Sequence, residues 1–216
     1  MAQSKEEQVT ITSGLVDGRA YAVIDNLFTE KELVKMENEF IRYKPLFQPP
    51  DKTGSAWNDK DTKCPIKKNN AVFLDNILNE PFASDIVQIT NTKMMRRELW
   101  ERLMENEVAF SYFRSNLGAT YLLSYYEDSD EYKEHADSSI FTWLVWLNQE
   151  PKRFTGGDLI LQGKKKIEFQ RGRVVIFPGY VRHEVTPVKL TGVGELPGRC
   201  VISIFNILAS REDSIR

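Results

Sequence analysis

The chain contains two histidines, His135 and His183, and the first stands two residues before Asp137. In an extended segment, residues i and i+2 face the same side, so His135 and Asp137 can bind one metal ion together. His183 follows the apolar segment 173–179 and can supply a third ligand from a distant part of the chain. Two histidines and one carboxylate hold Fe(II) in non-haem oxygenases and leave positions for a co-substrate and O2. An isolated H-x-D pair is more often a solvated turn, so the surrounding motifs decide.

The elements that must position these residues are short β segments, which follow one another from residue 108 to 210. Turn residues separate them at spacings typical of a β-sandwich or barrel. A jelly roll, with two facing antiparallel sheets, fits this number of strands. The predicted strands cover 108–114, 119–127, 139–148, 157–162, 165–169, 173–179, 183–188 and 200–208.

The N-terminal half is predicted to be mainly helical. Thr29 and Glu32 form a capping-box pattern ahead of a helix over 30–43, and an interrupted apolar stripe indicates helix over 81–106. Helices grouped before strands favour an α+β fold, mainly β. Short strands are expected at 21–28 and 71–78, a loose polar start at 1–18, and a substrate loop, either a lid or disordered, at 45–70.

Composition excludes several classes of protein. The 216 residues include 29 Lys and Arg against 31 Asp and Glu, so there is no basic surplus for nucleic-acid binding. No apolar run of about 18 residues predicts a membrane span, and the N-terminal segment does not resemble a signal peptide. Cys64 and Cys200 are too few for a disulfide framework, so a reducing, cytoplasmic setting is expected. We expect a single domain over 1–216, and the sequence gives no oligomeric state.

Short motifs in the C-terminal half support the metal-site interpretation when they are taken in order. They are Tyr125, Tyr132, His135-Ala136-Asp137, Leu147-Asn148, Phe154-Thr155-Gly156-Gly157-Asp158-Leu159, the segment 172–178, His183-Glu184-Val185-Thr186-Pro187-Val188, and Gly198-Arg199. In this order, residues 108–208 resemble the 2-oxoglutarate- and Fe(II)-dependent dioxygenases of the prolyl 4-hydroxylase-like branch. The resemblance implies a double-stranded β-helix, a cupin-like jelly roll, over 108–210, supported by helices in 1–107.

The resemblance also assigns roles to individual residues. Fe(II) would be held by the catalytic residues His135, Asp137 and His183. 2-Oxoglutarate would chelate the iron and place its far carboxylate on Arg199, whose planar guanidinium offers two parallel donors. Four further side chains would surround the co-substrate: Tyr125 through its hydroxyl, Leu159 as an apolar wall, and Trp146 and Ser203 as lining.

Two features depart from the family pattern. Sixteen residue positions separate His183 from Arg199, which is longer than usual, and the extra length falls in the turn-rich segment 189–198. A hairpin loop can grow without moving the strand that follows it, so Arg199 is still expected at the barrel floor. Trp146 stands where many relatives have a tyrosine, and indole offers one donor and no hydroxyl.

By resemblance, the enzyme would hydroxylate a substrate C–H, with a peptidyl proline as the leading candidate, and release succinate and CO2. It would use Fe(II), 2-oxoglutarate and O2, with ascorbate as a further candidate cofactor. A peptide or protein substrate is expected, without nucleic-acid or membrane partners. Two alternatives stay open: the same chemistry on a small molecule or another side chain, and a cupin-like binding module without redox chemistry. A cation at Arg199 favours the oxygenase, because a simple binding module does not need it.

Overall fold

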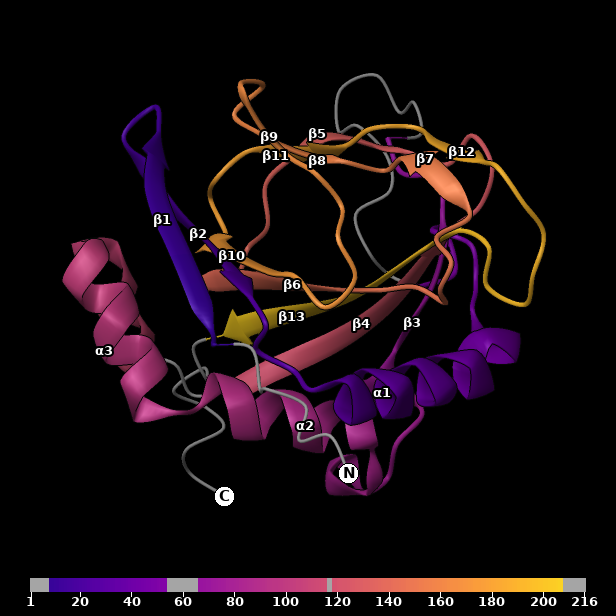
Figure 1. Cartoon of the computed structure of the whole chain (residues 1–216), viewed down its shortest axis with the longest axis horizontal. Helices are drawn as coiled ribbons and strands as arrows, with labels where there is room; N and C mark the ends of the chain where they lie inside the picture. The colour runs from indigo at the N-terminus through magenta and orange to yellow at the C-terminus, as the bar shows by residue number, and fades with distance from the viewer. Residues whose placement is uncertain (1–7, 54–65, 116–117, 208–216) are drawn as a thin grey trace.

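Two β-sheets face each other in the computed structural model, which describes residues 8–53, 66–115 and 118–207 (Figure 1). In this part of the chain the larger sheet has seven strands. In spatial order they are β1 (Thr10–Val16), β2 (Arg19–Asp25), β10 (Val174–Pro178), β6 (Phe141–Leu147), β13 (Arg199–Ile207), β4 (Gly118–Tyr126) and β3 (Asn70–Phe73). We call it the major sheet. Its strand pairs are antiparallel.

The opposing minor sheet carries four strands within the described ranges. They are β5 (Tyr132–His135), β11 (His183–Val185), β8 (Leu159–Leu161) and β9 (Lys165–Ile167), again in spatial order. A separate pair, β7 (Phe154–Gly156) and β12 (Val188–Leu190), continues from β8 and β11. Two facing antiparallel sheets of this kind form the double-stranded β-helix that the sequence predicts.

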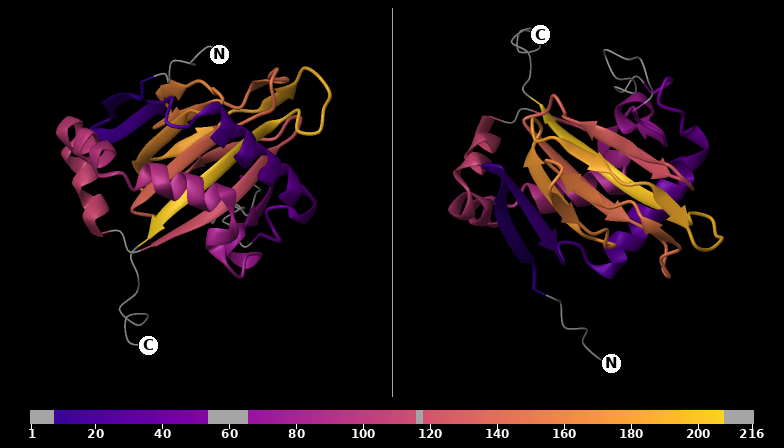
Figure 2. Two further views of the ribbon diagram at one scale, coloured as in Figure 1. Left: turned by 60° about the horizontal axis from the view of Figure 1, so that its bottom comes forward. Right: turned by 90° about the horizontal axis from the view of Figure 1, so that it is seen from above.

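Helices cover the outer face of the major sheet, the face that points away from the minor sheet (Figure 2). They are α1 (Glu30–Tyr43), α2 (Asp85–Met94) and α3 (Arg97–Asn106). The predicted capping box starts α1: the Thr29 amide donates to Glu32 at 2.8 Å, and the Glu32 amide donates to the Thr29 hydroxyl at 3.3 Å. The buried side of α1 presents Leu33, Met36 and Phe40 to the sheet.

Alternation along the strands separates two hydrophobic clusters. On β13, Cys200, Ile202 and Ile204 face the helices, whereas Val201 faces the minor sheet. Successive side chains of a strand point to opposite faces, which accounts for this alternation. The inner face also carries polar side chains, and these build the site described below.

Two predictions about the first half of the chain were wrong. Residues 10–16 are not a loose start but strand β1, which pairs with β2 through a turn at Asp17 and Gly18. Both turn residues have positive φ, 48° and 71°, as a tight hairpin requires. The helix predicted over 81–106 is two helices, because α2 ends at Met94, whose carbonyl accepts the Trp100 indole N–H at 2.6 Å.

The strand predicted over 108–114 was also wrong. Val108–Ser115 is a 3-10 helix, in which side chains three residues apart share one side. Phe110 and Phe113 have that spacing: Phe110 packs on Phe141 at 5.7 Å between ring centroids, and Phe113 stacks on Trp100 at 3.4 Å. A period of three, and not two, therefore governs this segment.

The prediction about the substrate loop falls only partly within the structure. Residues 45–53 and 66–70 are described, and Gln48 pairs with Ala71 beside β3. The middle of the loop, including Cys64, lies outside the described residues. Cys200 is buried and carries a free thiol. No helix in the described ranges is long and apolar enough to span a bilayer.

Candidate metal and co-substrate site

Neighbouring strands of the minor sheet bring the two histidines together. His135 ends β5 and His183 begins β11, and the two residues are direct cross-strand partners. Asp137 follows β5, where its backbone N–H donates to the Gly179 carbonyl at 2.8 Å. Gly179 is required there, because an added Cβ would lie 2.2 Å from the backbone oxygen of Ser139.

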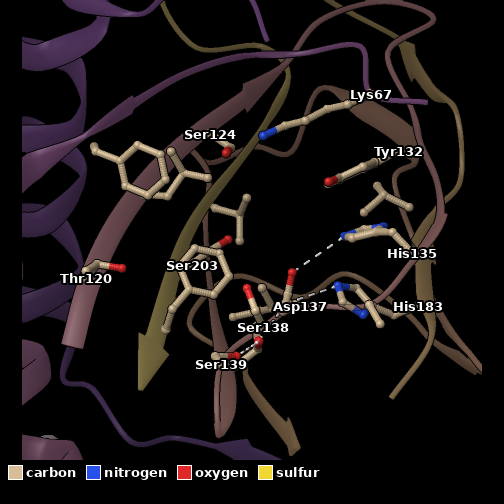
Figure 3. Close-up of a pocket in the computed structure, with 18 of the residues that line it drawn as sticks. Lys67, Thr120, Ser124, Tyr132, His135, Asp137, Ser138, Ser139, His183 and Ser203 are labelled. Carbon is tan, nitrogen blue, oxygen red and sulfur yellow. Dashed lines mark hydrogen bonds and ion pairs between the residues drawn. The ribbon is translucent and has the colours of Figure 1, made fainter. Parts of the chain in front are cut away.

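The predicted triad forms a compact set of ligand atoms (Figure 3). His135 Nε2 lies 3.9 Å from Asp137 Oδ1, and His183 Nε2 lies 3.6 Å from Asp137 Oδ2. One ligand atom from each residue lies within 4.8 Å of the other two. Two imidazoles and a carboxylate on one side of a cavity fit Fe(II), and this arrangement leaves the opposite coordination positions open.

Hydrogen bonds orient both imidazoles. His135 Nδ1 lies 2.8 Å from the Lys133 carbonyl and His183 Nδ1 lies 2.9 Å from the Val181 carbonyl, so each Nδ1–H donates and each Nε2 lone pair faces the triad. Burial, and next the neighbouring His183, hold the pKa of His135 far below its usual range. Its imidazole is therefore neutral, as a metal ligand must be.

A hydroxyl on the major sheet fixes the carboxylate. Thr142 Oγ1 donates to Asp137 Oδ2 at 2.6 Å, and Ser139 Oγ lies 2.9 Å from the same Thr142 oxygen. Thr142 is fully buried. The Asp137 carboxylate is thus held from the sheet opposite the histidines.

The triad opens into a cavity of about 360 Å³ between the two sheets. Inward-facing residues of β4, β6 and β13 line one side, and those of β5 and β11 line the other. The described residues that line it are Lys67, Phe73, Thr120, Leu122, Ser124, Tyr126, Tyr132, His135, Ala136, Asp137, Ser138, Ser139, Thr142, Leu144, His183, Val185, Arg199, Val201, Ser203, Phe205 and Ile207.

Arg199 lies at the floor of this cavity, as the sequence predicts, despite the longer segment before it. It is 1% exposed, and its Nε donates to the Gly157 carbonyl at 2.9 Å. Both terminal nitrogens are buried without a hydrogen-bond partner among the described residues. Burial lowers the pKa of the guanidinium below its usual value. A buried cation with two unmet donors fits a carboxylate ligand, which accepts two parallel hydrogen bonds.

Trp146 and Ser203 both lie on the inner face, but of the two the described cavity lining includes Ser203 and not Trp146. Trp146 is fully buried, its ring centroid is 5.6 Å from Arg199 Cζ, and its Nε1 has no partner within the described residues. It therefore adds an unmet donor beside the guanidinium. Ser203 lines the cavity two residues along β13 from Val201.

The structure corrects the placement of two predicted side chains. Tyr125 points to the helices, where its hydroxyl accepts the Gly198 N–H at 3.2 Å, and the cavity is lined instead by Tyr126. Tyr126 lies across from Arg199 in the sheet, with the guanidinium 4.9 Å from its ring, and burial raises its pKa to about 12. Leu159 is buried between the sheets but does not line the cavity, where Leu144 does.

The sequence did not single out Lys67. This residue forms a bridge with Tyr132, is 4% exposed and lines the cavity. Burial lowers its pKa to about 8, although the negative charge of Asp137 acts in the opposite direction. The sequence does not indicate this position, because Lys67 stands in a polar stretch that has neither helical nor strand periodicity.

A family model matches part of the chain. Residues 121–206, which contain the triad, Arg199 and most of both sheets, match the sequence profile of the 2OG-Fe(II) oxygenase superfamily. No curated protein sequence matches the chain at a significant level.

Several solved structures share the fold of this chain. The chain is similar to a prolyl-4-hydroxylase of Pseudomonas putida, with a TM-score of 0.60 and 14% identity over 90% of this chain and 95% of that one. The 2OG complex of the viral collagen prolyl hydroxylase of Paramecium Bursaria Chlorella virus-1 gives 0.55 and 16% over 88% and 97%. A 2OG-Fe(II) oxygenase family oxidoreductase of Burkholderia pseudomallei gives 0.57 and 13% over 88% and 86%.

Proposed function

We propose that the chain, whose residues 121–206 match the 2OG-Fe(II) oxygenase superfamily profile, is an oxygenase that hydroxylates a prolyl residue of a peptide or protein. The chain is a 2-oxoglutarate-dependent oxygenase that uses Fe(II), 2-oxoglutarate and O2. The prolyl substrate is the finer proposal. Its support is similarity to two prolyl hydroxylases at 14% and 16% identity. We propose that 1–216 act as one domain in a reducing, cytoplasmic setting, with ascorbate maintaining the iron as Fe(II).

One observation carries the oxygenase assignment. The metal triad and the buried Arg199 open into the same cavity, and both terminal nitrogens of Arg199 have no partner within the described chain. An unmet buried donor costs about 1–3 kcal/mol, so a site built this way is stabilised when a carboxylate arrives. A module that bound only a metal would have no use for this cation.

We assign each residue a role in binding and orientation. His135, Asp137 and His183 would hold Fe(II), which supplies one face for a chelating 2-oxo acid and for O2. Arg199 would receive the far carboxylate of 2-oxoglutarate, with the Trp146 indole as an additional donor. Tyr126 and Ser203 lie on the same inner face and take the lining role that the sequence gave to Tyr125 and Ser203.

Apolar side chains line the parts of the cavity where the two small molecules would lie. Leu144 and Val201 lie between Arg199 and the metal triad, where they would pack on the methylene carbons of the co-substrate. Phe73, Phe205 and Ile207 line another part of the cavity and provide an apolar surface for the substrate. Exclusion of water there limits loss of the oxidant to solvent.

Product analysis tests the prolyl proposal. The protein would be incubated with Fe(II), 2-oxoglutarate, ascorbate and O2, together with a panel of proline-containing peptides, and succinate would be measured alongside peptide mass. We expect succinate and a mass gain of one oxygen atom on proline, in equal amounts. Succinate formed with the oxygen on a different residue or molecule would refute the prolyl substrate and keep the oxygenase.

A further inference from the structure

A tight turn at Gly156 and Gly157 contacts the side chain of Arg199. Gly156 ends strand β7, which pairs with β12 beside the minor sheet (Figure 1). Arg199 Nε donates to the Gly157 carbonyl at 2.9 Å, and this is the one hydrogen bond of the guanidinium among the described residues. The direction of the buried cation therefore depends on a backbone group of this turn.

Two features of position 157 require glycine. Its φ is +67°, in the left-handed region that residues with a Cβ rarely adopt. An added Cβ would lie 2.8 Å from Arg199 Cδ and 3.1 Å from Val188 Cγ2. Any larger residue at this position would therefore have to displace the Arg199 side chain or distort the turn.

The segment that follows His183 holds the turn in place. Gly157 N–H donates to the Pro187 carbonyl at 3.4 Å. Asp158 N–H donates to Thr186 Oγ1 at 2.9 Å, and the Asp158 carbonyl accepts the Thr186 N–H at 3.0 Å. One short segment, residues 183–188, thus carries a metal ligand and also fixes the turn at the floor of the cavity.

The hydrogen bond to Gly157 determines which edge of the guanidinium can meet a ligand. A guanidinium offers parallel N–H groups on the edge between Nε and one terminal nitrogen and on the edge between both terminal nitrogens. Because Nε is engaged, a carboxylate can form two parallel hydrogen bonds only with the terminal nitrogens, end-on. The rings of Tyr126, Trp146 and Phe169 lie 4.9, 5.6 and 5.8 Å from Arg199 Cζ and restrict its remaining rotation.

We propose that Gly157 is a positioning residue of the co-substrate site: it orients Arg199 and, held by residues 183–188, sets the distance between the iron and the cation. The enzyme then selects 2-oxo diacids by length. It binds 2-oxoglutarate in preference to oxaloacetate, which is one carbon shorter, and to 2-oxoadipate, which is one carbon longer. This inference rests on the proposed function, because it requires the 2-oxo group at the metal and the far carboxylate at Arg199.

Binding of these three 2-oxo diacids tests the assignment without knowledge of the primary substrate. Fe(II)-loaded protein would be titrated with each acid under anaerobic conditions and followed by calorimetry and visible absorbance. Gly157→Ala would be compared with Gly163→Ala, a matched control. Gly163 also has a positive φ, 62°, but an added Cβ there meets nothing within 4 Å. Thr186→Val and Thr186→Ser test the contact that holds the turn while the glycine is kept.

We expect the wild-type protein to bind 2-oxoglutarate roughly tenfold or more tightly than either other acid. Gly157→Ala should weaken 2-oxoglutarate binding by about tenfold or more, since a displacement of about 1 Å at a binding group is costly. Its preference over at least one of the other acids should also fall markedly. Thr186→Val should change affinity and preference in the same direction by less. Gly163→Ala and Thr186→Ser should match the wild type, and Fe(II) affinity should be unchanged in every variant.

Several results would overturn the assignment. Gly157→Ala could keep both the affinity for 2-oxoglutarate and the preference for its length, or Gly163→Ala could weaken binding as much. Loss of Fe(II) binding in Gly157→Ala would show a general disruption of the site. If Gly157→Ala does not fold, equal binding by Thr186→Val and Thr186→Ser decides against the proposal. A wild-type protein that takes up Fe(II) but binds none of the three acids would refute the proposed function instead.

Discussion

The two faces of the major sheet differ in whether their buried donors have hydrogen-bond partners. On the outer face, the Trp143 indole donates to Asn206 at 2.8 Å and the Tyr121 hydroxyl donates to Asn91 at 2.9 Å. On the inner face, the Trp146 indole and both terminal nitrogens of Arg199 are equally buried but have no partner within the described residues. Strand β6 therefore carries a hydrogen-bonded indole on its outer face and, within the described residues, an indole without a hydrogen-bond partner on its inner face.

This contrast separates residues that stabilise the fold from residues that are positioned to bind a ligand. Native proteins pair nearly all their buried polar groups, so a cluster of unmet donors calls for an explanation. Here the cluster lies at the floor of a cavity that also holds the metal triad. Changes on the inner face should alter ligand binding, and changes on the outer face should alter stability.

Removal of a metal ligand is expected to have the largest effect on the inner face. Asp137→Ala or His135→Ala should lower Fe(II) affinity and succinate production by roughly 100-fold or more, since each supplies one of three ligand atoms. Metal analysis after dialysis and a succinate assay would measure this. Glu134→Gln is the matched control, because it removes only a surface ion pair with Arg182. Full 2-oxoglutarate turnover in Asp137→Ala would contradict the metal assignment.

Arg199→Met should weaken 2-oxoglutarate binding by roughly 30-fold or more, because a buried charge partner of the co-substrate is lost. The ligand-free variant should keep its Tm or gain in Tm, since it loses a buried cation whose two terminal nitrogens have no hydrogen-bond partner among the described residues. Thermal unfolding with and without 2-oxoglutarate reports both quantities. A large drop in Tm without ligand, with 2-oxoglutarate binding unchanged, would make Arg199 a structural residue.

Thr142→Val should reduce Fe(II) affinity by about tenfold, because the hydrogen bond that fixes Asp137 is lost while the shape of the side chain is kept. Thr142→Ser retains the hydroxyl and should bind Fe(II) like the wild type. Competition with a metal-binding dye would measure both variants. Equal affinity in all three proteins would mean that Asp137 is oriented without this hydroxyl.

The two tryptophans of β6 give the finest comparison. Trp143→Phe leaves Asn206 without its donor and should lower the free energy of unfolding by about 1–3 kcal/mol, with 2-oxoglutarate binding unchanged. Trp146→Phe should destabilise less and weaken 2-oxoglutarate binding roughly three- to tenfold. Chemical denaturation and calorimetric titration of both variants would show whether the faces divide in this way. If Trp143→Phe weakened 2-oxoglutarate binding and Trp146→Phe mainly lowered stability, the proposed division between a structural outer face and a ligand-binding inner face would be wrong.

The sequence predicts which side chains lie on the inner face where strand alternation or local spacing determines their direction. His135 and Asp137 are two residues apart, and β13 alternates from Arg199 onward, so their faces follow from the backbone period. Capping at Thr29 is a local signal in the same sense.

Where position depends on pairing between distant strands, the sequence alone was not sufficient. Tyr125 and Tyr126 are adjacent, and a shift of one residue exchanges their faces, so only the register of β4 against β13 decides which lines the cavity. Lys67 lacked a signal because its neighbours form no period. Asp17-Gly18 is a hairpin signal, but the polar residues around it resemble a loop more than a pair of strands.

The central claim is that the triad and Arg199 form one site for iron and 2-oxoglutarate. An anaerobic titration of the apoprotein with Fe(II) and 2-oxoglutarate, followed by visible absorbance, tests it most directly. We predict a weak charge-transfer band that requires both components, is absent in His135→Ala, and needs far more 2-oxoglutarate in Arg199→Met. No band at confirmed Fe(II) occupancy, or a band with the same 2-oxoglutarate dependence in Arg199→Met, would contradict the claim.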